Sequence, residues 1–243
     1  MTSTTVAITS LTRRVDELDW NGTVGAIDEV GIAAIGSILD SDECRHLSAL
    51  YDDAERFRTT IDMARHRFGD GRYRYFEHPL PAPIGELRST FYAHLAPVAN
   101  TWAERLGEEE RYPARHEELL ERCAAAGQRR PTPLILRYGA GDWNALHQDL
   151  HGEVFFPFQV LTVLSRRGVD FEGGEFVLHE QRPRAQSRAH VLTPPPGAFV
   201  IFPTHHRPGA GKRGWHRAGL RHGVSTVTSG SRTALGIIFH DAA

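Results

Sequence analysis

The chain has 243 residues, of which 28 are Lys or Arg and 30 are Asp or Glu, giving a formal net charge of -2. Hydrophobic residues make up 40% of the sequence and charged residues 24%, a composition that excludes intrinsic disorder, collagen and coiled coil. The balanced charge also excludes the whole-chain basic field that drives nonspecific nucleic-acid binding.

The number of cysteines and the lengths of the apolar runs indicate the cellular compartment in which the protein is expected. Cys44 and Cys123 do not suffice for a disulfide framework and do not form a C-x-x-C motif, which favours a reducing cytoplasm. The N-terminal segment has no apolar stretch of secretory length, and no later run approaches the ~18 apolar residues of a membrane span. The sequence therefore predicts a soluble, cytoplasmic protein with no membrane partner.

The first half of the chain is predicted to be mainly helical. Residues 31–39 alternate weakly between apolar and small residues and could form a strand. Ser41, followed by two acidic residues, is typical of a helix N-cap, and apolar residues continue at helical spacing as far as Phe57. Further helices are expected over residues 83–106 and 115–126, the second ended by a glycine.

From Pro131 onward, short runs rich in Phe, Val, Ile and Leu alternate with Gly and Pro. The expected strands are residues 132–138, 155–165, 174–180, 198–203, 224–228 and 233–240. Short strands with frequent turn signals favour a sandwich or barrel over a parallel sheet. Because there is no repeat and no linker, the sequence predicts a single domain over residues 1–243, with 1–130 as mainly helical support and 131–243 as an antiparallel β core.

The candidate chemistry begins with His147 and Asp149. Residues two apart in an extended segment point to the same face, so these side chains can converge on one metal. The chain has 14 histidines, so a chance pair, a surface His beside a solvated Asp, is the alternative. His222 completes a set of two His and one carboxylate, the facial triad of non-haem Fe(II) oxygenases.

Arg232, ten residues after His222, adds a cation suited to bidentate capture of a carboxylate. A 2-oxoglutarate molecule chelates iron through its keto-acid end and needs a fixed cation for its distal carboxylate. In one flat hairpin turning at residues 229–231, the two side chains would stand ~20 Å apart along the ladder. The turn is therefore expected to carry the chain to a facing sheet, so that both side chains point into one interior.

These motifs resemble the Fe(II)/2-oxoglutarate dioxygenase superfamily, on its prolyl-4-hydroxylase-like and AlkB-like side. The matching stretches are LRYGAG, LHQD, FEGGEF, PPGAFVIF and RHGVSTVTSGSR. Across nearly its whole length, including TIDMARHRFG, YRYF, RPTPLILRYGAGD and EQRPRAQSR, the chain is similar to a bacterial 2OG-Fe(II) oxygenase family often labelled as acting on alkylated DNA. The resemblance implies an α+β fold with a double-stranded β-helix (jelly-roll) core and supporting N-terminal helices.

The resemblance also implies roles for individual residues. Metal ligands are implied at His147, Asp149 and His222. Arg232 would hold the distal carboxylate of 2-oxoglutarate, and Tyr138 would hydrogen-bond this cosubstrate. The implied cofactors are Fe(II), 2-oxoglutarate and O2, and the implied reaction hydroxylates a substrate C–H with release of succinate and CO2. Related halogenases lack the carboxylate, so Asp149 favours hydroxylation, or demethylation through an unstable hydroxymethyl product.

The substrate class stays open. AlkB-type repair enzymes carry R-x-N-x-x-x-R after the distal His, whereas this chain has Ala234 and Ile238 in place of the Asn and the second Arg. With the balanced charge, this favours a small molecule, either an amino-acid derivative or a natural-product intermediate. Demethylation of alkylated nucleic acid and hydroxylation of a protein side chain are the enzyme alternatives. A cupin-like metal-binding module is the non-enzyme alternative, although such a module needs no carboxylate anchor at Arg232.

Residues 61–76, IDMARHRFGDGRYRYF, interleave basic and aromatic side chains. As a substrate-facing lid this segment would offer cations and stacking groups to an anionic or aromatic substrate. The candidate substrate residues in it are Arg65, His66, Arg67, Tyr73 and Tyr75. A Gly-hinged surface hairpin is the alternative. A second basic stretch, residues 205–222, is interpreted as a solvated loop or as lining of the site entrance.

Overall fold

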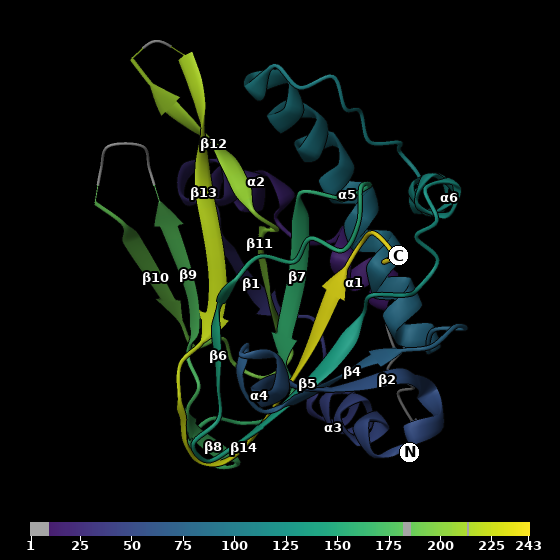
Figure 1. Cartoon of the computed structure of the whole chain (residues 1–243), viewed down its shortest axis with the longest axis vertical. Helices are drawn as coiled ribbons and strands as arrows, with labels where there is room; N and C mark the ends of the chain where they lie inside the picture. Colours follow the sequence, from purple (N-terminus) through teal and green to yellow (C-terminus); the bar gives the residue numbers. More distant parts are fainter. Residues whose placement is uncertain (1–9, 182–185, 213) are drawn as a thin grey trace, which may run out of the picture.

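The computed structural model describes residues 10–181, 186–212 and 214–243. Two antiparallel sheets face each other, and helices cover the outer side of the larger sheet (Figure 1). The helices are α1 (Leu11–Asp16), α2 (Trp20–Val30), α3 (Ser41–Ala49), α4 (Met63–His66), α5 (Ala82–Leu106) and α6 (His116–Ala125). Short 3-10 turns over Leu50–Asp52 and Ala54–Arg56 follow α3.

The larger sheet runs through the middle of the molecule. Its strands are, in spatial order, β1 (Ala33–Ser37), β11 (Ala198–Pro203), β7 (Phe158–Val163), β14 (Val227–Ile238), β5 (Leu134–Gly139), β4 (Arg72–Phe76) and β2 (Phe57–Asp62). β8 (Phe171–Gly173) pairs with the first residues of β14. Every residue of β7 and β11 is buried, which explains why these strands are mainly apolar and lack a regular polar alternation.

The smaller sheet faces it across the interior (Figure 1). Its strands are, in order, β10 (Arg188–Leu192), β9 (Phe176–Gln181), β13 (Gly214–Val224), β6 (Trp143–His147) and β3 (Gly69–Asp70), with β12 (His206–Gly211) paired to β13. Two facing antiparallel sheets of this kind form a jelly roll. This confirms the α+β fold with a double-stranded β-helix core and helices supporting it.

An apolar core lies on each face of the larger sheet because successive residues of a strand point to opposite sides. Leu235 and Ile237 of β14 join the outer core, where Phe91 of α5 packs. Ala234 of β14 joins the inner core between the sheets, together with Leu178 of β9. The outer core fixes the helices, and the inner core leaves space at one end for a cavity.

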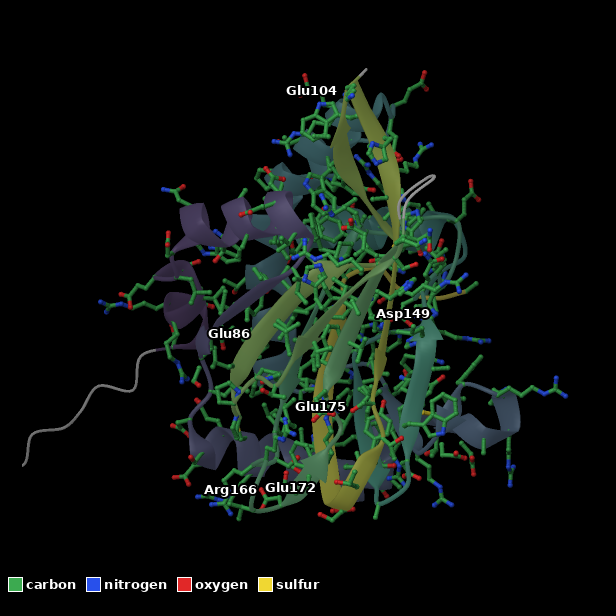
Figure 2. All side chains as sticks on the ribbon, turned by 90° about the vertical axis from the view of Figure 1, so that its left-hand side faces the viewer. Glu86, Glu104, Asp149, Arg166, Glu172 and Glu175 are labelled. Carbon is green, nitrogen blue, oxygen red and sulfur yellow. The ribbon has the colours of Figure 1, made fainter. Side chains whose placement is uncertain are left out.

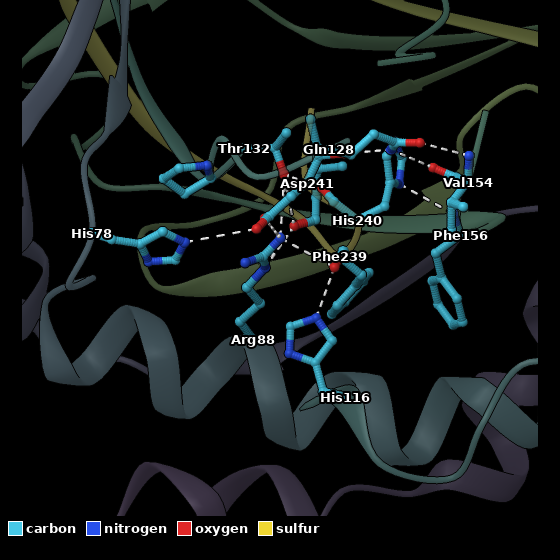
Figure 3. Close-up of polar contacts among 12 residues, drawn as sticks. His78, Arg88, His116, Gln128, Thr132, Val154, Phe156, Phe239, His240 and Asp241 are labelled. Atoms are coloured by element: carbon cyan, nitrogen blue, oxygen red, sulfur yellow. Dashed lines mark hydrogen bonds and ion pairs between the residues drawn. The ribbon is translucent and has the colours of Figure 1, made fainter. Parts of the chain in front are cut away.

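A buried polar network ties α5 to the end of β14 (Figure 3). Arg88 donates from Nε to the carbonyl of Ile238 at 2.9 Å and from Nη2 to Oδ1 of Asp241 at 2.8 Å. The Nε2–H of His116 donates to the carbonyl of Phe239 at 2.7 Å, and burial lowers the pKa of this imidazole to about 3. The network joins the C-terminal residues, which lie past the last strand, to the supporting helix layer.

The first half of the chain departs from the expected pattern in two ways. The predicted helices over 83–106 and 115–126 are confirmed as α5 and α6. The predicted N-cap Ser41 is wrong by one residue, because Asp40 accepts hydrogen bonds from the next turn and Glu43 completes its capping box. The expected continuation of that helix to Phe57 is also wrong. The chain there passes into β2, whose pairing with β4 overrides the local apolar spacing.

Residues 1–130, which were expected to be mainly helical, therefore also contribute strands. β1, β2 and β4 extend the larger sheet, and β3 extends the smaller one, so strands from both halves of the chain share the two sheets. The basic stretch 205–222, interpreted as a solvated loop, instead forms the paired strands β12 and β13. Its polar composition concealed the strands, because much of this hairpin faces outward.

The step between the sheets occurs earlier than predicted. β13 lies in the smaller sheet and β14 in the larger one, so the chain crosses at residues 225–226, not at 229–231. Residues 229–231 are part of β14, which pairs first with β8 and then with β5. The expected consequence is confirmed, because His222 and Arg232 line the same interior cavity.

Two further observations concern the described part of the chain. No helix in it is long and apolar enough to cross a bilayer. Residues 182–185, within the EQRPRAQSR stretch that contributed to the family resemblance, lie outside the described residues.

Candidate active site

Three potential metal ligands converge where β6 and β13 pair. His147 at the end of β6 lies opposite His222 of β13 in the antiparallel register. Asp149 follows β6 by two residues, and its Oδ1 is 3.5 Å from Nε2 of His147 while its Oδ2 is 3.2 Å from Nε2 of His222. The ligand atoms of the three residues all lie within 4.8 Å of one another. In Figure 2 Asp149 lies above Glu175, which marks the turn between β8 and β9.

Hydrogen bonds orient this cluster. The Nδ1–H of His147 donates to the carbonyl of Ala145 at 2.8 Å, which fixes the ring so that Nε2 points toward Asp149. Gln148, between the two ligands in sequence, donates from Nε2 to the carbonyls of His205 and Leu220, at 2.9 and 2.8 Å. The segment after β6 is thereby fixed to the neighbouring chain, so the position of Asp149 does not depend on a free loop.

The electrostatics of the cluster suit a divalent cation. Burial by itself opposes ionisation of Asp149, but hydrogen bonds from His147 and His222 outweigh it and hold the carboxyl pKa well below its usual range. Burial and then the neighbouring His147 lower the pKa of His222. An ionised carboxylate with two imidazole nitrogens, open on one side, is the donor set that non-haem Fe(II) oxygenases use. The three residues therefore fit an iron site.

Arg232 is a buried cation with no acid partner among the described residues. Its side chain lies on β14, only 1% of the residue is exposed, and Nε and Nη2 have no hydrogen-bond partner among the described residues. Burial lowers the pKa of this guanidinium. A buried arginine is normally paired, so an unpaired one that lines a cavity calls for an anionic ligand.

Tyr138 lies beside Arg232 on the adjacent strand β5. The two residues are partners in the β5–β14 register, and the guanidinium carbon is 5.6 Å from the tyrosine ring centre. Burial raises the pKa of the phenol, which therefore keeps its proton. The Nδ2 of Asn144 donates to the phenol oxygen at 3.3 Å, leaving the phenol hydrogen free to bind a ligand. The sequence pattern did not bring out Asn144.

Gly174 makes room for Arg232. A Cβ atom at this position would lie 2.7 Å from Cδ of Arg232, and the backbone has φ of +62°. Both features require glycine. The sequence alone does not reveal this role of Gly174, because nothing local shows which side chain packs on it.

We expect Gly174→Ala to displace the guanidinium and weaken 2-oxoglutarate binding by roughly tenfold, equivalent to ~1.4 kcal/mol. The measurement is calorimetric titration of the Zn(II)-loaded protein with 2-oxoglutarate. Gly127→Ala is the matched control, because Gly127 also has a positive φ of +81° but its Cβ would meet nothing within 4 Å. Equal affinity in both variants would contradict the proposed role of Gly174.

The triad and Arg232 share one cavity of about 300 Å³. It is lined mainly by apolar and aromatic side chains from both sheets. The lining residues include all three potential metal ligands, both predicted cosubstrate residues, and Phe68, Tyr73, Tyr75, His151, Gln159, Phe176 and Phe202. The structure thus brings together the five residues predicted for metal and cosubstrate, from four strands and the segment after β6.

The candidate substrate residues divide into two groups. Tyr73 and Tyr75 of β4 lie on the cavity wall. Arg65, His66 and Arg67 do not line it; they are exposed on α4 and its C-cap. These basic side chains are exposed on the short helix while Phe68 reaches the cavity, so the structure does not place the three basic residues on the cavity wall. The sequence pattern of residues 61–76 does not single out Phe68, because it is one of several aromatic residues in that segment.

Solved structures share the fold of this chain. The structure matches a prolyl-4-hydroxylase of Pseudomonas putida with TM-score 0.51 and 14% identity, covering 92% of this chain and 99% of that one. It matches an oxidoreductase of the 2OG-Fe(II) oxygenase family from Burkholderia pseudomallei with TM-score 0.53 and 19% identity, covering 92% and 93%. A prolyl hydroxylase from Trichoplax adhaerens gives TM-score 0.54 and 15% identity, covering 95% and 92%. At these identities the likeness shows the fold, and the donor set of this chain is the one expected for a non-haem Fe(II) oxygenase.

The sequence comparison narrows the class to a family. Residues 71–242 match the model of a family described as "Oxygenase, catalysing oxidative methylation of damaged DNA", and the chain belongs to this family. The chain is also 47% identical over 184 residues to an uncharacterized protein found in two strains of Mycobacterium tuberculosis, covering 72% of this chain and 79% of the relative. The protein is therefore an oxidoreductase that uses Fe(II), 2-oxoglutarate and O2, and the non-enzyme alternative is set aside.

Proposed function

We propose that this oxygenase binds Fe(II) through His147, Asp149 and His222, and 2-oxoglutarate through Arg232 and Tyr138. The observation that carries the assignment is the buried Arg232, which has no acid partner among the described residues and lines the cavity of the triad. A dicarboxylate reaching from the metal site to this arginine would supply the missing counter-charge.

Each residue has a separate task in this proposal. Asp149 and the two imidazoles supply three donors on one side of the metal. Arg232 fixes the distal carboxylate, and the phenol of Tyr138, whose oxygen accepts from Asn144, donates its hydrogen to the cosubstrate. When bound, Fe(II) and 2-oxoglutarate supply the oxidising chemistry: one atom of O2 enters succinate as CO2 leaves, and the other becomes a hydroxyl group on the substrate carbon.

As substrate we propose a small molecule, such as an amino-acid derivative or a natural-product intermediate. The cavity of about 300 Å³ must also hold the cosubstrate, which leaves room for one compact group. Ala234 and Ile238, the positions where AlkB-type repair enzymes have Asn and Arg, are both apolar and line this cavity. The chain also carries no net positive charge to attract a duplex.

Oxidative demethylation of alkylated nucleic acid is the second candidate. The description of the family, which names damaged DNA, favours it. Phe68 and Leu150 also favour it, because both line the cavity and are 47% and 49% exposed, as base-stacking groups would be. The ring of His66 stacks on Phe68 with centres 5.5 Å apart. Hydroxylation of a protein side chain remains a prediction from sequence.

The cytoplasmic location predicted from the sequence also belongs to the proposal. The buried free thiols of Cys44 and Cys123 support it, because unpaired cysteines are typical of a reducing compartment.

The first test is succinate formation by the Fe(II)-loaded protein with 2-oxoglutarate and O2, without added substrate. We expect slow succinate release that His222→Ala abolishes, because a ligand is lost. His46→Ala is the matched control, since His46 is exposed on α3 and does not line the cavity. Equal succinate formation by His222→Ala and the unchanged protein would contradict the ligand assignment.

A second measurement separates the two substrate candidates. A short single strand carrying an N-methylated base is titrated with the Zn(II)- and 2-oxoglutarate-loaded protein at low and at moderate salt. We expect no binding even at low salt if the substrate is a small molecule. Salt-dependent binding that is lost in Phe68→Ala would favour the nucleic-acid candidate.

A further inference from the structure

Gln159 is a buried polar residue whose side-chain nitrogen is unpaired in the described part of the chain. It lies on β7, in the middle of the larger sheet, where only 4% of the residue is exposed. Its Nε2 has no hydrogen-bond partner among the described residues. The side chain lines the cavity of the triad, between the walls formed by its register partners Phe202 and Ile238. An unpartnered buried donor is rare in proteins and needs an explanation.

The other carboxamides of the cavity are engaged. Asn144 donates to the phenol oxygen of Tyr138. Gln148 donates to two backbone carbonyls and so fixes the segment between the metal ligands. Of the cavity carboxamides in the described part of the chain, Gln159 alone has a donor nitrogen that is both buried and free.

The cosubstrate does not reach Gln159. In the sheet register Arg232 pairs with Tyr138, whereas Gln159 pairs with Ile238, six residues further along β14. At about 3.3 Å per residue this separates the two positions by ~20 Å along the sheet. A short dicarboxylate bound to Arg232 and the metal cannot span this distance. The free donor therefore belongs to the part of the cavity that remains for the substrate.

The charges of the cavity restrict the substrate group further. Among the described residues that line it, Arg232 is the only Arg or Lys and Asp149 the only carboxylate. In the proposed function the cosubstrate binds Arg232 and the metal binds Asp149. No further Lys, Arg, Asp or Glu remains to neutralise a substrate charge, so the group that enters should be neutral.

We propose that Gln159 determines substrate specificity by donating a hydrogen bond from Nε2 to a carbonyl oxygen, or an equivalent acceptor, on a neutral amide-like group of the substrate. The inference rests on the proposed function, since it assumes that metal and cosubstrate occupy the rest of the cavity. A substrate without this acceptor leaves the donor unpaired and is rejected, which is how buried polar groups discriminate between analogues. The bond also positions the neighbouring C–H of the substrate relative to the triad.

The test uses small probes of equal ring size. The Zn(II)- and 2-oxoglutarate-loaded protein is titrated with 2-piperidone, a neutral lactam, and with cyclohexane as the acceptor-free probe, by ligand-observed NMR. We expect 2-piperidone to bind more tightly than cyclohexane, and Gln159→Met to weaken it by tenfold or more. Met keeps the length and approximate volume of the side chain but cannot donate. Cyclohexane binding should not change in this variant.

A signal from the side chain itself adds a second readout. The chain has five glutamines, so the carboxamide signals of protein labelled with 15N-glutamine can be assigned by loss of one signal in Gln159→Met. We expect that signal to shift when 2-piperidone is added. Gln186→Met is the matched control, because Gln186 is exposed outside the strands and the same replacement there should leave lactam affinity unchanged.

The outcomes separate this inference from the proposed function. If 2-oxoglutarate does not bind the unchanged protein, the proposed function fails. If 2-oxoglutarate binds but 2-piperidone does not, or binds equally well to Gln159→Met, the role of Gln159 is overturned while the oxygenase assignment stands. Retained 2-oxoglutarate affinity in Gln159→Met rules out misfolding as the cause of a loss.

Discussion

Replacing Arg232 with Met is expected to weaken 2-oxoglutarate binding by at least an order of magnitude and, in the ligand-free protein, to raise thermal stability. The guanidinium is buried and has no acid partner among the described residues, so its desolvation is uncompensated until a carboxylate binds. Truncating one partner of a buried charge pair costs ~2–5 kcal/mol of binding, or roughly 30-fold to several thousand-fold in Kd. Calorimetry with 2-oxoglutarate and a thermal unfolding scan measure the two effects.

Arg207 provides the matched control. It is also a buried arginine, 4% exposed, but its Nε donates to Oε2 of Glu180 at 2.8 Å. Arg207→Met would leave a buried carboxylate without this partner, so we expect it to lower stability and to spare 2-oxoglutarate binding. The two replacements should thus shift the unfolding temperature in opposite directions. Retention of 2-oxoglutarate affinity within a few-fold in Arg232→Met would disprove the anchor assignment.

The largest loss of stability is expected from Asp241→Ala. Asp241 accepts a hydrogen bond from Arg88, a residue only 1% exposed on α5, and Figure 3 shows this pair within the network that joins α5 to the chain end. Removing the carboxylate leaves a buried guanidinium without its counter-charge, which costs ~3–5 kcal/mol. Chemical denaturation, compared at equal m-value, measures the change in free energy of unfolding.

Two further variants test whether loss of charge pairing is the cause of the lower stability. Combining Asp241→Ala with Arg88→Met removes both charges and should recover part of the lost stability, which a simple cavity effect would not do. Glu17→Ala breaks an ion pair whose side chains are 71% exposed for Arg13 and 57% for Glu17, and it should leave the free energy of unfolding nearly unchanged. Additive losses in the double variant would show that charge pairing is not the reason.

The fold was predictable where a single physical signal dominates. The buried strands β7 and β11 are mainly apolar, and α5 has one long apolar face, so their types follow from the sequence. The strands β2, β12 and β13 escaped prediction because their residues are only partly buried and many are polar. Their conformation depends on pairing with distant strands, which local propensity does not report.

The candidate site, too, was only partly predictable from the sequence. The spacing of His147, Asp149, His222 and Arg232 brought out these residues, because metal and carboxylate binding restrict the residue types that can serve. The sequence did not reveal that Gly174 makes room for Arg232 or that Gln159 has a free donor in the cavity. Both features depend on neighbouring side chains that come from strands far apart in the sequence.

The sequence by itself determined the class of chemistry and the layered β architecture, because both depend on residue types at fixed spacing. Only the tertiary structure decided which side chains enter the cavity. Tyr73 and Tyr75 line it while Arg65 does not, although the three belong to one basic and aromatic segment. The reason is that the pairing and facing of the two sheets determine which side chains line the cavity. The same packing determines whether a polar side chain finds a hydrogen-bond partner.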